Sequence, residues 1–261
     1  MHLWPFGGVT LMRLSRTHSA SGIHYFHVKL IVKRTWMTST SSYNHADSQV
    51  RIYDRTKSVV FLRTKDSFGG LSNMAGGFSL CVNGIKFRTA EALYQACRFP
   101  HLPEIQQLII DAPSPMIAKM TSKLNLELSR SDWIRVRVRI MRWCLRAKLL
   151  ENWQSFGNLL LESGDKPIVE LSFKDEFWGA KPVDKFKLVG MNVLGRLLME
   201  LREELNSDQH DSLLRVIPVQ ISDFILLGLP IETLTKESRQ VTPQPNSIKA
   251  KVEQTTLFDH S

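Results

Sequence analysis

The sequence predicts an α+β fold, a single, predominantly helical domain with small strands and a hairpin near its N-terminal end. Three observations support this fold class. Short apolar runs separated by glycine, serine and asparagine fill residues 58–87, which is typical of strands and turns. Residues 89–164 carry a succession of helical patterns with start and stop signals. A strand-like run and one amphipathic helix follow, and no internal repeat is present.

Two segments predict the strands. "SVVFL" at residues 58–62 predicts a short buried strand. "FSLCVNGIKF" at residues 78–87 predicts a hairpin, because Asn83-Gly84 suits the two left-handed positions of a tight turn. The intervening stretch "SFGGLSNMAGG" predicts a turn region. Its backbone N–H groups could face an anion, although a plain turn is the favoured interpretation.

Caps and proline positions predict the first helices. Thr89 is a suitable N-cap for a helix that runs from Ala90 to about Phe99 and ends before Pro100. Residues 103–112 and 114–124 predict two further helices, the second with a proline in its first turn.

A longer helix is predicted to begin at Asp132 and to continue through "WIRVRVRIMRWCLRAKLLENW". Helical spacing gives it an apolar stripe made of Ile134, Val138, Met141 and Leu145. The next stripe consists of Arg135, Arg139, Arg142 and Arg146. These arginines could contact nucleic-acid phosphates, but an ordinary solvent-facing surface is favoured.

The remaining elements complete the domain. Residues 156–164 continue the helical pattern as far as Gly164, and a glycine just after the last helical turn predicts a helix end there. "PIVELSF" predicts a strand, and "GMNVLGRLLMELREEL" predicts a final amphipathic helix.

The composition is that of a globular chain with a basic balance. Hydrophobic residues make up 43% of the 261 residues and charged residues 23%, enough to build a core. The net charge of +9 predicts attraction to polyanions such as nucleic acid or nucleotides, and a merely basic enzyme fits it equally well. Three cysteines without C-x-x-C spacing argue against a disulfide scaffold or a thiolate zinc site. No apolar run approaches the roughly 18 residues of a membrane span, so a cytoplasmic protein without a membrane partner is expected.

Composition also divides the chain into three regions. Residues 1–55 form a basic leader with no acidic residue before Asp47. That composition resembles an organelle-targeting segment, but the lack of periodicity favours a disordered leader or a start site further in. Residues 56–205 form the predicted domain. Residues 206–261 are expected to be an extension that is mostly a disordered tail, with the tail beginning at Lys236. Residues 213–231 could add one strand or a short helical cap to the domain.

The helix over residues 90–99 carries the first candidate site. Glu91, Gln95 and Arg98 share one of its faces. An acid, an amide and a guanidinium could bind a sugar hydroxyl, a base edge and a phosphate, whereas the alternative is a solvated face with a weak ion pair. His101 is the only histidine inside the domain, which makes a histidine-driven mechanism improbable. Catalysis would then depend on carboxylates, and Glu91 and Asp175 are the best-placed candidates.

Two later segments carry the other candidates. In "KDEFWGAKP", residues 174–182, the pair Trp178-Gly179 stands within a charged run. Trp178 is therefore either a buried anchor or the wall of a ligand site. In "GMNVLG", two glycines flank Asn192 at a helix start, so Asn192 could approach a ligand and the helix N-terminus could face a phosphate. The alternative is an N-cap with close helix packing.

Together and in this order, these motifs resemble the NADAR family, a group that includes bacterial and plant N-glycosidases acting on riboflavin-pathway intermediates. The resemblance runs from about Phe61 to Leu205. It rests on Leu71-Ser-Asn73, Thr89-Ala-Glu91, Ser114-Pro115 with Ala118-Lys119, Asp132-Trp133, Ala147-Lys148, Asp175-x-x-Trp178-Gly179 and Gly190-x-Asn192-x-Leu194-Gly195.

The resemblance implies an α+β, mainly helical domain that cleaves a ribose C1′–N bond. The implied substrates are nucleotide-like small molecules, either phosphoribosylamino-pyrimidines or, in other members, ADP-ribose attached to guanine. The residues implied to line the pocket are Glu91, Trp133, Asp175 and Trp178. Those implied to hold ribose and phosphate are Ser72, Asn73 and Asn192. Trp178 would stack on the base, Gly179 would let the backbone turn close to it, and no metal or redox cofactor is required.

Arg98 departs from the family pattern, in which many members carry lysine at this position. Arginine stays charged across the working pH range, so it can bind phosphate but cannot replace a covalent or proton-donating lysine. The chain could therefore act on a different substrate, such as ADP-ribosylated nucleobases, or have lost activity. The alternative outside enzymes is a non-catalytic module that binds ADP-ribose or nucleic acid.

The C-terminal tail adds one further hypothesis. Gln254-Thr-Thr-Leu-Phe258 resembles the Q-x-x-L-F peptides that dock on bacterial sliding clamps. A clamp contact would place the protein at DNA and would favour ADP-ribosylated nucleic acid as its partner.

Overall fold

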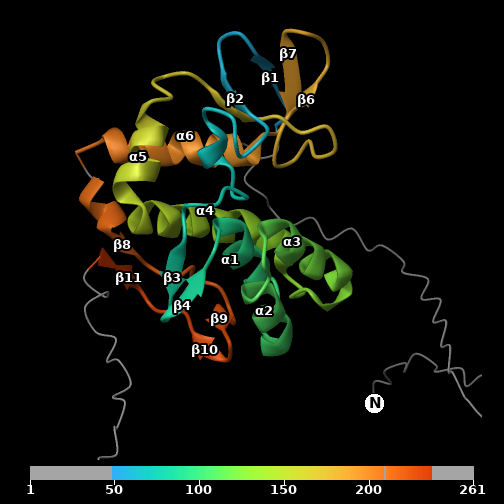
Figure 1. The fold of residues 1–261 in the computed structure, drawn as a ribbon, viewed down its shortest axis with the longest axis vertical. Coiled ribbons are helices and arrows are strands. Elements are labelled where there is room, and N and C mark those ends of the chain that lie inside the picture. Colours follow the sequence, from blue (N-terminus) through green and yellow to red (C-terminus); the bar gives the residue numbers. More distant parts are fainter. Residues whose placement is uncertain (1–48, 209, 237–261) are drawn as a thin grey trace, which may run out of the picture. The chain divides into compact units, whose positions relative to one another are not determined.

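The structure is a computed structural model that describes residues 49–208 and 210–236 (Figure 1). Most of the basic leader and the clamp-like peptide Gln254–Phe258 lie outside the described residues. The expectations about targeting, start site and clamp binding therefore stay predictions.

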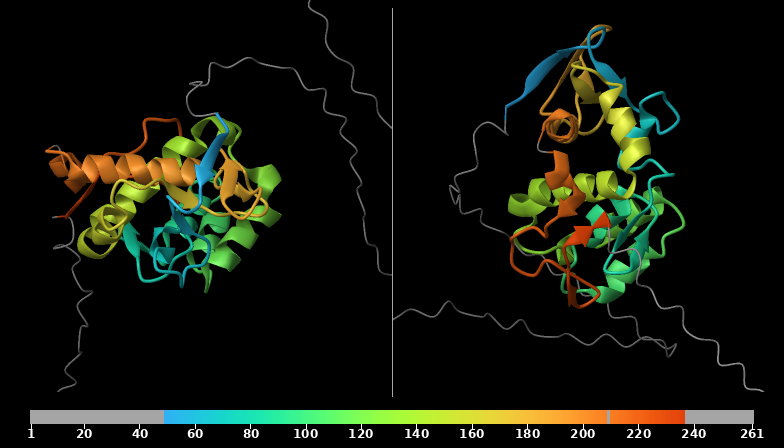
Figure 2. Two further views of the ribbon diagram at one scale, coloured as in Figure 1. Left: turned by 90° about the horizontal axis from the view of Figure 1, so that it is seen from above. Right: turned by 90° about the vertical axis from the view of Figure 1, so that its left-hand side faces the viewer.

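Helices form most of the described fold, and every predicted helix is present. They are α1 (Ala90–Ala96), α2 (Pro103–Ile110), α3 (Pro115–Leu124), α4 (Trp133–Glu151), α5 (Trp153–Leu161) and α6 (Val193–Asn206). Short 3₁₀ helices occur at η2 (Gly69–Leu71), η3 (Leu126–Leu128) and η4 (His210–Leu214). Helix α4 crosses the middle, with α5 and α6 on one side and α1 to α3 on the other (Figures 1 and 2). The predicted α+β class is confirmed.

The strands are short and form several small ladders. They are β1 (Arg51–Asp54), β2 (Val59–Phe61), β3 (Leu80–Val82), β4 (Ile85–Phe87), β5 (Ile168–Glu170), β6 (Lys181–Pro182), β7 (Lys187–Gly190), β8 (Arg215–Val216), β9 (Ile225–Leu226), β10 (Leu229–Pro230) and β11 (Leu234–Thr235). The order β1-β7-β6 gives an antiparallel sheet, and β3-β4, β9-β10 and β8-β11 are antiparallel pairs. Strands β2 and β5 pair in parallel, with Val60 opposite Val169.

Local sequence signals place several elements correctly. Thr89 caps α1, its Oγ1 accepting from Ala92 N at 3.3 Å. Ser114 caps α3 in the same way, accepting from Ile117 N at 3.2 Å. Asn83 has a φ of 50° and Gly84 a φ of 76°, so the predicted hairpin turn is confirmed.

The buried face of α4 differs from the predicted stripe at its first turns. Ile134, expected inside, is 59% exposed, whereas Val136 and Ile140 are buried. Apolar residues occur on nearly every side of this helix, so the sequence pattern could not decide which side faces the core. The neighbouring helices α1 and α6 decide it by packing against α4.

Folded segments of the described chain extend past residues 56–205 at both ends. Strand β1, inside the predicted leader, pairs with β7 and buries Tyr53. Its four residues carry one buried side chain, which is too short a pattern to detect. Beyond residue 206, where a mostly disordered extension was expected, Phe224 packs edge to face on Trp143 with ring centroids 5.0 Å apart. Gln106 fixes the same segment, donating to Ile225 O at 3.1 Å and accepting from Leu227 N at 2.7 Å.

Candidate functional site

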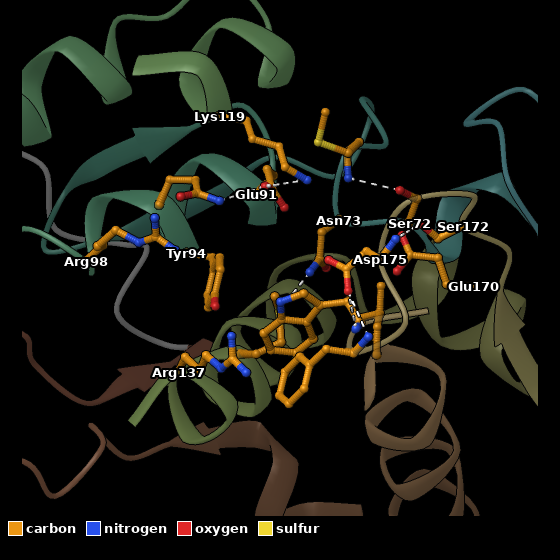
Figure 3. A pocket seen from close by; sticks show the side chains of 16 residues that line it. Ser72, Asn73, Glu91, Tyr94, Arg98, Lys119, Arg137, Glu170, Ser172 and Asp175 are labelled. Atoms are coloured by element: carbon orange, nitrogen blue, oxygen red, sulfur yellow. Dashed lines mark hydrogen bonds and ion pairs between the residues drawn. The ribbon is translucent and has the colours of Figure 1, made fainter. Parts of the chain in front are cut away.

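A cavity of about 350 Å³ lies where α1, α3, α4, the η2 loop and the segment after β5 meet (Figure 3). The structure brings seven of the ten predicted site residues to its walls: Ser72, Asn73, Glu91, Gln95, Arg98, Asp175 and Trp178. The other three predicted residues do not line it: Trp133, Gly179 and Asn192. The cavity also has lining residues that were not predicted, among them Tyr94, Lys119, Arg137 and Glu170.

The loop that carries Ser72 and Asn73 is anchored from below by Lys148. The Lys148 ammonium is fully buried and donates to Gly70 O at 2.6 Å and Ser72 O at 3.1 Å. Asn73 O in turn accepts from Glu91 N at 3.1 Å, which joins the loop to the first turn of α1. The carbonyls of the loop are therefore used to hold its shape.

Asn73 keeps one polar atom without a partner. It is 3% exposed, and its Nδ2 donates to Met141 Sδ at 2.8 Å. Among the described residues, its Oδ1 has no hydrogen-bond partner. A buried acceptor without a donor is unfavourable by about 1–3 kcal/mol, so a ligand hydroxyl or amine would be a matching partner.

Helix α1 presents the predicted polar face to the cavity. Glu91 is 6% exposed, accepts from Gln95 Nε2 at 2.9 Å and lies 3.7 Å from Lys119 Nζ of α3. All seven residues of α1 are buried, which explains why its apolar residues are spread around the whole helix. The polar face is therefore an interior wall and not a solvated surface.

Trp133 lies behind the wall and supports Arg98. The Arg98 guanidinium carbon lies 4.6 Å from the Trp133 ring centroid, and the Tyr94 ring lies 5.0 Å from the same indole. Burial lowers the pKa of Arg98 and raises that of Tyr94 well above its usual value. Trp133 is not among the residues that line the cavity, and its ring contacts two residues that do, Arg98 and Tyr94.

The segment from residue 174 to 182 forms the opposite wall. Asp175 Oδ1 accepts from Phe177 N and Trp178 N, both at 2.9 Å, so this carboxylate shapes the turn that presents Trp178. The Trp178 ring lies edge to face against Tyr94 at 5.7 Å. Arg137 of α4 covers Phe177, with its guanidinium carbon 3.7 Å from the ring centroid. Trp178 is therefore a partly buried aromatic wall with fixed orientation.

Asn192 and the start of α6 serve the protein and not a ligand. Asn192 is buried with a φ of 48°. Its Nδ2 donates to Ile168 O at 2.9 Å, and its Oδ1 accepts from Glu170 N at 3.1 Å. The amides of Val193 and Leu194 donate to Phe177 O and Trp178 O, at 2.9 and 3.1 Å. Asn192 is not among the residues that line the cavity, and both ends of its amide are bonded to the backbone of β5, so its role as a ribose or phosphate contact stays a prediction.

Gly179 is required by packing and not by a ligand. A Cβ at this position would lie 2.5 Å from Glu170 O, so only glycine lets the chain pass against β5. Gly179 is not among the residues that line the cavity, although its neighbour Trp178 is.

Glu170 is the main site residue that the sequence analysis missed. It ends β5 and lines the cavity beside Ser172. Burial, followed by the nearby charges of Glu91 and Asp175 and opposed by Lys119, raises its pKa to about 7. The available signal was a glutamate at the end of an apolar strand, in "PIVEL".

The arginine stripe of α4 lies away from this cavity. Arg142 pairs with Glu200 and Arg146 with Glu204, with nitrogen-to-oxygen distances of 2.8 and 2.6 Å. Both acids belong to α6, so these arginines join two helices. Within the described ranges, no helix is long and apolar enough to cross a membrane, and no group of three or more His, Cys, Asp and Glu side chains is placed to hold a metal ion.

Comparisons with known proteins agree with the position of this cavity. The sequence model of the NADAR domain matches residues 60–206, and this range contains every residue named above as lining the cavity. The N-glycosidase YbiA of Escherichia coli (strain K12) is 34% identical over 147 residues, which cover 56% of this chain and 88% of that protein. The N-glycosidase Npun_R5314 of Nostoc punctiforme is 30% identical over 151 residues, covering 57% and 93% of the two chains.

A longer relative and one solved structure complete the comparison. The riboflavin biosynthesis protein VVA0006 of Vibrio vulnificus is 32% identical over 184 residues, covering 69% of this chain and 48% of that protein. The chain thus spans about half the length of this relative. The NMR structure of E. coli YbiA aligns with a TM-score of 0.49 at 33% identity, covering 58% of this chain and 90% of the other.

Proposed function

The chain belongs to the NADAR family, and from that premise and the cavity we propose that it is an N-glycosidase that hydrolyses a ribosyl C1′–N bond. The observation that carries the proposal is the meeting of carboxylates, edge-to-face aromatic rings and cations around one small cavity (Figure 3). Each of these three groups matches one part of a ribonucleotide.

The carboxylates match the chemistry at C1′. Breaking an N-glycosidic bond builds positive charge on the ribose ring, as in other glycoside cleavages. A buried carboxylate at that position stabilises the charge and can orient the attacking water. We assign this role to Glu91, which Gln95 and Lys119 hold in place. Asp175 shapes the Trp178 turn through Oδ1, and its Oδ2, which has no hydrogen bond to the described chain, is available to a ribose hydroxyl.

The rings and the cations match the base and the phosphate. Trp178 and Tyr94 form an aromatic corner that can hold a planar base by stacking. Asn73 Oδ1 can accept from a ribose hydroxyl. Arg98 and Arg137 line the same cavity and can bind a phosphate, a role that arginine performs well and that needs no lysine at position 98.

The size of the cavity favours the smaller of the two substrate classes. Its 350 Å³ lies at the low end of the range for ligand pockets, about 300–1,000 Å³. That volume suits a single phosphoribosylated base, such as a phosphoribosylamino-pyrimidine, better than ADP-ribose attached to guanine. We therefore propose the phosphoribosylated pyrimidine as the substrate, with ADP-ribosyl-guanine as the competing candidate.

The test measures release of free base by the purified full-length protein. One reaction contains a phosphoribosylamino-pyrimidine and the other ADP-ribosylated guanosine. Glu91→Gln is expected to reduce kcat at least 100-fold, because it removes the charge that faces the reacting carbon. Glu176→Gln is the matched control, since this exposed carboxylate pairs with Lys181 outside the cavity and its loss leaves the rate unchanged.

Each outcome separates the candidates. Turnover of the pyrimidine alone supports the proposed substrate, and turnover of ADP-ribosylated guanosine alone moves the assignment to that class. Binding of either compound without release of base would overturn the enzymatic proposal and leave a non-catalytic binding module.

A further inference from the structure

Glu170 is fixed in the cavity by its backbone. Its N–H donates to Asn192 Oδ1 at 3.1 Å, and its carbonyl accepts from Ala180 N at 2.8 Å. Strand β5, which it ends, lies in register with β2. The backbone therefore has little freedom here, and the side chain points into the cavity from a rigid element (Figure 3).

The Glu170 carboxyl differs from the other two carboxyls of the cavity in its partners. Glu91 accepts from Gln95 and faces Lys119, and Asp175 accepts from two backbone amides. Within the described chain, the Glu170 side chain has no hydrogen bond or ion pair. The side chain is half-buried. A carboxyl that is partly withdrawn from water and has no donors is more stable in its protonated form, since the charged form loses part of its hydration without compensation.

The charges that face Glu170 come from three elements. Glu91 on α1 and Asp175 on the loop after β5 favour the protonated carboxyl, and Lys119 on α3 opposes them. Burial is the largest influence, and together these effects raise the pKa of Glu170 to about 7. A group with that pKa carries a proton in an appreciable fraction of molecules at neutral pH and can release it in a reaction.

We propose that Glu170, positioned by Asn192, is the proton donor to the departing base. This inference rests on the proposed function and adds the acid that the reaction needs. A base nitrogen leaves poorly as an anion, and the general acid of a glycosidase protonates the leaving atom as the bond breaks.

The step balances as a hydrolysis. The C1′–N bond breaks, and its electron pair goes to the base nitrogen, which takes the proton from Glu170. Water adds its oxygen to C1′ and passes one proton to Glu91. That proton returns through solvent to the Glu170 carboxylate, and the products are the free base and the ribose with a new hydroxyl at C1′.

The decisive experiment combines a variant that lacks the acid with two substrates, one whose leaving group needs a proton and one whose leaving group does not. Glu170→Gln is nearly isosteric but cannot donate the proton. We expect kcat on the phosphoribosylamino-pyrimidine to fall by about 10²–10⁴, the usual contribution of general acid catalysis, with little change in KM. On 4-nitrophenyl ribofuranoside 5-phosphate, whose nitrophenolate leaves without a proton, the same variant should stay within about tenfold of wild type.

The pH profile supplies an independent readout. The wild-type kcat should fall as pH rises through about 7, because Glu170 then loses its proton. Glu170→Gln should lose this alkaline limb. An equal loss on both substrates, or an unchanged alkaline limb, would overturn the role of Glu170. If wild type releases no base at all, the proposed function fails instead, so the two failures are distinguishable.

Asn192 is tested as a positioning residue. Asn192→Ala removes the bond to Glu170 N and lets the strand end relax toward solvent. We expect a lower kcat together with an alkaline limb displaced to lower pH, since a better hydrated carboxyl has a lower pKa. A merely structural role would reduce stability and leave the limb in place, and that result would contradict the positioning role.

Discussion

Lys148 is a fully buried ionisable group and Glu170 a half-buried one, and loss of hydration moves their pKa values toward neutrality from opposite sides. The pKa of Lys148 is lowered to about 7 and that of Glu170 is raised to about 7. Their surroundings differ in what the chain offers them. Lys148 donates to two carbonyls and lies over the rings of Phe78 and Phe156, with its ammonium 4.7 and 4.1 Å from their centroids.

The Glu170 carboxyl, in contrast, receives nothing from the described chain and faces a cavity. A perturbed pKa alone therefore does not identify a functional group, since structural networks also perturb pKa values. The informative feature is whether the protein itself satisfies the group. Lys148 is satisfied and holds a loop, whereas Glu170 is left for something that enters the cavity.

The largest expected effect is an opposite pH dependence of stability. The folded-state pKa of Lys148 is depressed, so its contribution is complete above about pH 10.5 and is lost as pH falls toward 7. The folded-state pKa of Glu170 is raised, so its contribution is complete below about pH 4.5 and is lost as pH rises toward 7. Each shift corresponds to a change on the order of 3–5 kcal/mol in the free energy of unfolding. Urea denaturation between pH 4.5 and 10 measures both changes.

Two variants assign those changes to their residues. Lys148→Met should remove the rise in stability above pH 7, and Glu170→Gln should remove the fall between pH 4.5 and 7. If either slope persists in its variant, the burial of that group is not its cause.

Truncating Lys148, which has hydrogen-bond partners in the chain, should destabilise the protein more than substituting Glu170, which has none among the described residues. Lys148→Ala leaves a cavity between two rings and removes the donor to Gly70 O and Ser72 O, so we expect a loss of about 3 kcal/mol at pH 7. Glu170→Gln should change the free energy of unfolding by less than about 1 kcal/mol at pH 4.5, where both side chains are neutral and the substitution breaks no internal contact. At pH 7 the same variant should be more stable than wild type, because it lacks the raised pKa that lowers wild-type stability between pH 4.5 and 7. Equal losses in urea denaturation would contradict the distinction between the two sites.

The support behind Glu170 should be sensitive to a single methyl group. A Cβ on Gly195 would lie 2.1 Å from Ile168 O and 2.5 Å from the Asn192 amide nitrogen. Gly195→Ala should therefore lower the free energy of unfolding by about 2 kcal/mol. Gly157→Ala is the matched control on α5, since its Cβ would meet side chains only at 3.5 Å, and it should be neutral or slightly stabilising. If Gly195→Ala is as stable as wild type, the contact of Gly195 with Ile168 O and the Asn192 amide is not as close as the structure has it.

Ion pairs that remain partly exposed to solvent should contribute least to the free energy of unfolding. Arg146 and Glu204 form a hydrogen-bonded pair, but their side chains remain 34% and 31% exposed. Arg146→Ala should therefore change the free energy of unfolding by only about 0.5 kcal/mol, and less at high salt. If Arg146→Ala lowers the free energy of unfolding as much as Lys148→Ala does, solvent exposure does not explain how much a charged side chain contributes to stability.

The part of the site that could be predicted lies within single elements or motifs. Glu91, Gln95 and Arg98 follow from helical period, because one short helix decides which side chains share a face. Asp175 and Trp178 follow from one compact turn. Lys119 and Arg137 could not be found in this way, since they reach the cavity from α3 and α4, and each looks like an ordinary helix-surface charge in the sequence.

Three of the predicted site residues do not line the cavity, which also shows that sequence alone cannot place a side chain. Trp133, Gly179 and Asn192 stand next to the cavity in the chain, but each is used by the fold. The Trp133 ring packs against Arg98, and the Asn192 amide bonds to β5. Gly179 has no side chain and therefore fits against Glu170 O. Proximity in sequence indicates a functional region, but only packing decides which layer a side chain occupies.

The sequence by itself determined the helix caps, the hairpin turn, the fold class and the carboxylate on α1, because short-range sterics and hydrogen bonds set these features within a few residues. Only the tertiary structure decided which side of α4 is buried, how the segment up to residue 236 joins the core, and that Glu170 is left without a partner. These outcomes depend on contacts between segments far apart in the chain. A pKa depends on them too, since it reports the solvent and charges around a group and not the residues beside it in sequence.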